Sequence, residues 1–147
     1  MPPHPDQKGW VDEAKALQEI YRLVPKAIED PSFARSQPMP LMKQLLQIRA
    51  AALARAGRVS EAVEAAKELR SLPDDPEGPL NVGRVYALIV RSLANEKPEV
   101  RAPYVAAAVE SLAAAVRANP SLVQRLEYDQ FLESIRDEPS FRSLLAH

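Results

Sequence analysis

The stretch from Leu46 to Leu72 places two alanine-rich segments on either side of a single glycine, Gly57. Small side chains at helical spacing let two helix backbones approach closely, and a glycine between them supplies the positive φ that reverses the chain. The alanines at helical spacing include Ala50, Ala52 and Ala56 before the glycine and Ala62, Ala65 and Ala66 after it. The stretch therefore predicts a helical hairpin that stacks on further hairpins, with Ser60 as the N-cap of its second helix.

Composition favours an all-α fold and excludes several classes of protein. Aromatic residues make up only 5% of the 147 residues, so alanine, leucine and valine must fill the core, which favours closely packed helices. The absence of cysteine excludes disulfides, thiolate catalysis and cysteine-type zinc sites. With a net charge of −1, the chain lacks the positive electrostatic potential that binding to nucleic acid or to an anionic membrane needs. With no membrane-length apolar run and no signal-peptide pattern, we expect a cytoplasmic protein.

Periodicity and proline positions divide the chain into a leader and one helical domain. Residues 1–9 carry three prolines and predict a disordered leader, and residues 10–147 predict a single domain. We expect a kink or break at Pro25, a linker over 31–40 and a long turn over 95–102. Short helices follow, with starts at Asp129 and Pro139. The expected helices cover 10–28, 41–56, 60–72, 80–94, 103–118 and short segments within 129–146.

Two helical pairs share features at the spacing of roughly 34 to 47 residues that is typical of helical repeats. The segment Asn81–Leu88, NVGRVYAL, resembles the first helix of a tetratricopeptide repeat, with Gly83 as the small residue at the helix crossing and Tyr86 one turn later. Gly57 and the alanines after it resemble the turn and second helix of such a repeat. The resemblance implies antiparallel helical hairpins stacked as a short solenoid.

The C-terminal part resembles the closing repeat of tetratricopeptide arrays in bacterial proteins, many of which follow serine/threonine kinase domains. The segment Glu127–Leu145, EYDQFLESIRDEPSFRSLL, carries the acidic, leucine, arginine, acidic-proline, phenylalanine and double-leucine pattern of that motif. This resemblance implies a short helical cap over the open end of the stack. Two features depart from the pattern: Arg49 replaces a large apolar residue, and the turn over 95–102 is long. No kinase segment is present.

Residue types that perform catalysis or bind metals are sparse. His4 and His147 lie at the two termini, which argues against a histidine base, a catalytic triad and a histidine metal site. The acidic loop around Asp74 and Asp75 lacks the alternating oxygen ligands and distal glutamate of a calcium loop. The four glycines form no phosphate-binding motif. We therefore expect no enzyme, no cofactor and no metal.

Arginines recur on the second and fourth expected helices, and Arg84 and Arg91 share one helical face. This stripe is either a solvated face or a groove that binds a partner's acidic segment or C-terminal carboxylate, since arginine pairs with carboxylate in a bidentate manner. The first helix of each tetratricopeptide pair lines the inner groove, so the resemblance nominates partner-binding residues. These are Gln44, Gln47, Ala51, Arg55, Arg84, Ala87, Leu88 and Arg91.

Three functional hypotheses follow. The first is a non-catalytic interaction module that binds a peptide or protein through this inner groove. The second is a structural or self-associating spacer segment of a longer multidomain bacterial protein, because exposed helix faces at the ends of a short stack favour association. The third is a small-ligand or enzyme domain, which would need an apolar pocket where Glu127, Tyr128 or Asp129 converge.

Overall fold

The computed structural model describes residues 5–39, 41–72 and 75–146, except for the side chains of 5–14, 16 and 17. The described residues are helical and contain no strand, which confirms the expected all-α class. None of the described helices is both long enough and apolar enough to cross a membrane. The elements are α1 (Pro5–Glu29), α2 (Pro31–Arg35), α3 (Leu41–Arg55), α4 (Val59–Ser71), α5 (Gly78–Ser92), α6 (Pro98–Ala118), α7 (Leu122–Leu126), the 3₁₀ helix η1 (Gln130–Ile135) and α8 (Pro139–Ala146).

Helices α3 and α4 form the hairpin expected around Gly57. This glycine has φ +76°, and two backbone bonds close the end of α3: Gly57 N donates to Ala54 O at 3.1 Å and Arg58 N to Leu53 O at 3.0 Å. This pair of bonds is a Schellman motif, which satisfies carbonyls that the helix end leaves free. The motif leads directly into α4 at Val59. The expectation that Ser60 is the N-cap is therefore wrong.

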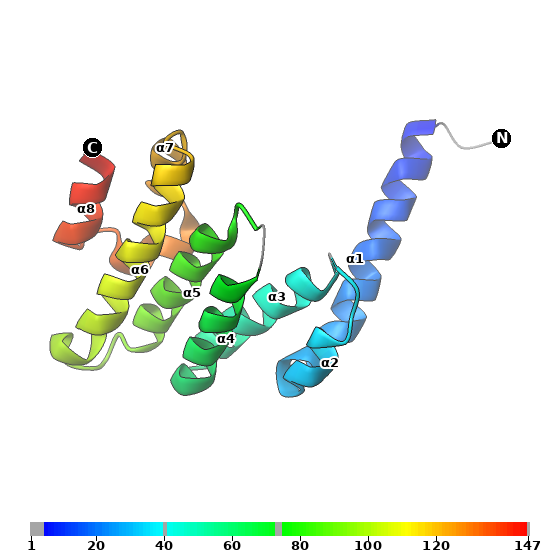
Figure 1. The fold of residues 1–147 in the computed structure, drawn as a ribbon, viewed down its shortest axis with the longest axis horizontal. Coiled ribbons are helices and arrows are strands. Elements are labelled where there is room, and N and C mark those ends of the chain that lie inside the picture. The colour runs from blue at the N-terminus through cyan, green and yellow to red at the C-terminus, as the bar shows by residue number, and fades with distance from the viewer. Residues whose placement is uncertain (1–4, 40, 73–74, 147) are drawn as a thin grey trace.

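Helices α5 and α6 form a second pair, and α5 also packs against both α3 and α4 (Figure 1). Gly83 lies at a close approach of α5 to α6, because a Cβ added there would lie 2.7 Å from Cγ and Cδ2 of Leu112. Helix α6 begins at Pro98, whose missing N–H is no loss in the first turn of a helix. The connection therefore spans 93–97, and the longer turn expected over 95–102 is wrong.

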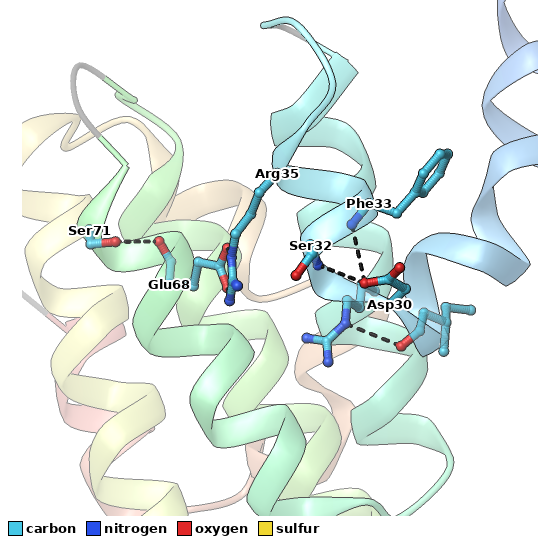
Figure 2. Close-up of polar contacts among 8 residues, drawn as sticks. Asp30, Ser32, Phe33, Arg35, Glu68 and Ser71 are labelled. Carbon is cyan, nitrogen blue, oxygen red and sulfur yellow. Dashed lines mark hydrogen bonds and ion pairs between the residues drawn. The ribbon is translucent and has the colours of Figure 1, made fainter.

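The N-terminal part of the chain differs from the prediction in three places. Helix α1 starts at Pro5 and continues through Pro25 to Glu29, so residues 5–9 of the expected leader are helical and the helix is not broken at Pro25. Helix α2 lies inside the expected linker, where Asp30 Oδ1 accepts hydrogen bonds from the backbone N of Ser32 and Phe33 (Figure 2). An N-cap with proline at the next position is a strong local start signal. Residues 1–4 of the expected leader lie outside the described residues.

The C-terminal segments close one end of the helical array. In Figure 1, α1 and α8 lie at opposite ends, with α3 to α6 side by side between them. Asp129 caps η1 by accepting a hydrogen bond from Phe131 N at 2.9 Å, and α8 starts at Pro139, so both expected starts are confirmed. Leu132, Ile135 and Phe141 are fully buried. One core therefore runs from Ala27 of α1 to Phe141 of α8.

Candidate binding surface

The eight residues nominated from the sequence do not form one exposed face. Gln44, Arg55 and Arg91 are exposed, while Gln47, Ala51 and Arg84 are half-buried. Ala87 and Leu88 are buried, with exposed fractions of 0% and 3%. Their side chains are part of the core, so neither offers a contact surface to a partner.

The α3 half of the nominated surface remains accessible. Gln44, Gln47, Ala51 and Arg55 recur at i, i+3, i+7 and i+11, which places them along one side of a helix. Gln47 is also tied to the next pair of helices, because its Nε2 donates to Oδ1 of the buried Asn81 of α5 at 3.0 Å. This hydrogen bond fixes the amide and the relative position of α3 and α5.

Part of the α5 half of the nominated surface lies against η1. The Oγ of Ser134 donates to the carbonyl oxygen of Ala87 at 2.6 Å, and η1 packs along α5. Expecting Ala87 and Leu88 to line an open groove was therefore wrong, because both side chains are buried and the chain's own η1 packs on α5 at Ala87. The helical period of α5 marks this side as apolar, but no local pattern says which segment covers it.

Arg84 has its carboxylate partner within the chain. Its Nε and Nη2 lie 2.9 and 2.8 Å from Oδ2 of Asp129, and the side chains are 26% and 8% exposed. Asp129 Oδ1 accepts the backbone hydrogen bond that caps η1. Both oxygens are therefore occupied, and the guanidinium of Arg84 helps to hold η1 against α5. This pairing removes Arg84 as a free anchor for an acidic partner.

Phe131 brings the two nominated arginines together. The guanidinium carbons of Arg55 and Arg84 lie 5.4 and 5.2 Å from the centre of its ring, which is cation–π distance. Phe131 is 36% exposed, and Arg55 makes no ion pair or side-chain hydrogen bond within the described part of the chain. Arg55 is thus held over a ring while its N–H donors face solvent. Sequence reasoning missed Phe131, since it belongs to another element and follows no spacing shared with the arginines.

The region around residues 127–129 does not assemble the pocket that a small-ligand function would need. Glu127 pairs with Arg142 at 3.3 Å, and Tyr128 is 79% exposed. Of these three residues, only Asp129 borders the nearby cleft of about 230 Å³, and its carboxylate is paired with Arg84. Within the described ranges, no group of three or more histidine or carboxylate side chains could hold a metal ion.

Comparisons with protein-family models, with curated protein sequences and with solved structures return no match to this chain. The functional argument therefore depends on the arrangement of the residues themselves.

Proposed function

We propose that this chain is a tetratricopeptide-like interaction module, and that it binds a peptide or protein segment along the exposed side of α3. The packing of α5 against both helices of the α3–α4 pair supports the repeat-like arrangement. The close approach at Gly83 and the positive φ of Gly57 support it as well. In this proposal η1 and α8 form the cap over the last pair.

The observation that carries the proposal is the position of Arg55. Its guanidinium is held over Phe131, has no acidic partner among the described residues and lies on the same side of α3 as Gln44, Gln47 and Ala51. The small side chain of Ala51 leaves room for the backbone of a bound segment, and the amides of Gln44 and Gln47 can form hydrogen bonds with that backbone. The bound segment therefore carries a carboxylate, which pairs with Arg55, beside groups that contact the exposed edge of Phe131.

The test compares Arg55→Glu with the matched charge reversal Arg117→Glu, which changes an exposed arginine of α6. Proteins captured from the lysate of the source cells are quantified for each variant by mass spectrometry. Partners of this surface are retained by the wild type and by Arg117→Glu, and they are reduced at least about tenfold by Arg55→Glu, since a charge-assisted hydrogen bond is replaced by repulsion. If folded Arg55→Glu captures the same proteins as the wild type, this surface is not the binding site.

A further inference from the structure

A second hollow lies between α2, α3 and α4, with a volume of about 810 Å³. We call it the end groove. Its floor is apolar, with side chains from Met42, Leu46, Ala65 and Leu72. Figure 2 shows Arg35 of α2 reaching across to Glu68 of α4, where Nε and Nη2 lie 2.6 and 2.7 Å from the two carboxylate oxygens. An ion pair therefore crosses the end groove.

The end groove is separate from the surface around Arg55. Met42, Leu46 and Arg49 recur at i, i+4 and i+7 of α3, and at 100° per residue they lie on the side of the helix opposite Ala51 and Arg55. A ligand in the end groove would not touch the Arg55 surface. The two surfaces can therefore be tested independently.

Every carboxylate that lines the end groove already has a cation. Glu61 pairs with Arg58 at 2.7 Å, Glu64 with Lys67 at 3.5 Å and Glu68 with Arg35. The hydrogen bonds from Arg58 also lower the pKa of the Glu61 carboxyl. The acidic side of the end groove is thus neutralised from within the chain.

Arg49 is the charged lining residue of the end groove that lacks an ion pair in the described structure. It is only 7% exposed, and its Nε donates to the carbonyl oxygen of Ile28 at 3.2 Å, close to the C-terminus of α1. Its two terminal nitrogens have no hydrogen-bond partner among the described residues. The terminal nitrogens are not among the side-chain atoms that the structure seals from solvent, so they open into the end groove. A ligand that covers the end groove would remove this charge from water, which favours a ligand with a carboxylate that pairs with Arg49.

We propose that the end groove binds an amphipathic helix of a partner protein, which places apolar side chains on Met42, Leu46 and Leu72 and one carboxylate against Arg49. The α3–α4 pair already receives a helix on another side, because α5 packs against both. The α4 wall has 13 residues, about 20 Å of helix, which suits a segment of three to four turns. The open terminal nitrogens of Arg49 select an acidic residue on the apolar side of that helix.

The probes are four synthetic helical peptides of about four turns, each with leucines along one side and one glutamate at a different position of that side. Each has a matched peptide with glutamine instead. Binding of labelled peptides to the full chain is measured by fluorescence anisotropy. In at least one register the glutamate peptide binds about tenfold or more tightly than its glutamine partner. Equal affinities in all four registers, or no binding, overturn the proposal.

Variants separate this proposal from the Arg55 surface. Arg49→Met removes the preference for glutamate, and Met42→Glu, at a half-buried position, weakens both peptides without changing a buried charge. Arg55→Glu leaves peptide binding within twofold of the wild type. If Arg55→Glu abolishes binding, the peptides occupy the other surface and the proposal fails. Sedimentation of the chain alone at several concentrations is the last control. If the chain self-associates and Met42→Glu abolishes this association, the end groove binds a second copy of the chain, and the proposal of a partner helix is overturned.

Discussion

Arg84 of α5 and Asp129 at the start of η1 form an ion pair across 45 positions of sequence, with Nε and Nη2 of the guanidinium within 2.9 Å of one carboxylate oxygen. Removing the carboxylate with Asp129→Ala leaves Arg84 without its partner and η1 without its N-cap. We expect a loss of about 1–3 kcal/mol in the free energy of unfolding, measured by urea denaturation.

Two further variants separate the contribution of the charge from that of the N-cap and provide a control. Asp129→Asn keeps an oxygen that can cap η1 but loses the charge, so its loss should be smaller than that of Asp129→Ala. Asp137→Asn changes an exposed carboxylate and should stay within about 0.5 kcal/mol of the wild type. Equal stability of Asp129→Ala and the wild type would show that the pair does not hold η1 in place.

Gly83→Ala should destabilise the chain, because the added Cβ would lie 2.7 Å from atoms of Leu112 in α6. Helix α5 and helix α6 must then move apart or Leu112 must change rotamer, at a cost of about 1–3 kcal/mol. The same substitution in a Leu112→Ala background should cost clearly less, since the clashing atoms are gone. Urea denaturation of the wild type, the two single variants and the double variant gives the coupling free energy between positions 83 and 112. Additive losses of stability would contradict the close approach of the two helices.

Gly57→Ala tests the turn between α3 and α4 by a different mechanism. No atom lies within 4 Å of the position that a Cβ would take, so the cost comes from φ +76° alone and should be about 1 kcal/mol. Gly57→Asn should cost less than Gly57→Ala, because asparagine tolerates this conformation better. A thermal melt that shows alanine and asparagine to be equal to glycine would be inconsistent with the left-handed turn.

The Arg58–Glu61 pair predicts a pH effect at an exposed site. Hydrogen bonds from Arg58 lower the pKa of the Glu61 carboxyl below its ordinary value of 4.5. A carboxyl whose pKa is lower in the folded state contributes stability above pH 4.5, and that contribution is lost as the pH falls through the lowered pKa. Carboxyl ¹³C NMR titration should show the pKa of Glu61 rising toward 4.5 in Arg58→Gln. It should not move in the control Arg55→Gln.

The candidate binding surface was only partly predictable. Gln44, Gln47, Ala51 and Arg55 could be placed on one side of a helix from spacing alone, and the structure leaves that side accessible. Ala87 and Leu88 followed from the same reasoning, yet both are buried in the core, and η1 packs on α5 at Ala87. Periodicity gives the direction in which a side chain points along its own helix, but the element that meets it there depends on the path of the whole chain.

Local rules account for the hairpin at Gly57, the cap at Asp129, the start at Pro139 and the all-α class, since each depends on neighbouring residues or on composition. The positions where Asp129 meets Arg84, Phe131 meets Arg55, and Arg49 meets the end of α1 were set only when helices distant in sequence packed together. Backbone conformation is fixed by short-range sterics and hydrogen bonding, whereas the balance of buried charge is fixed by which surfaces the fold brings together.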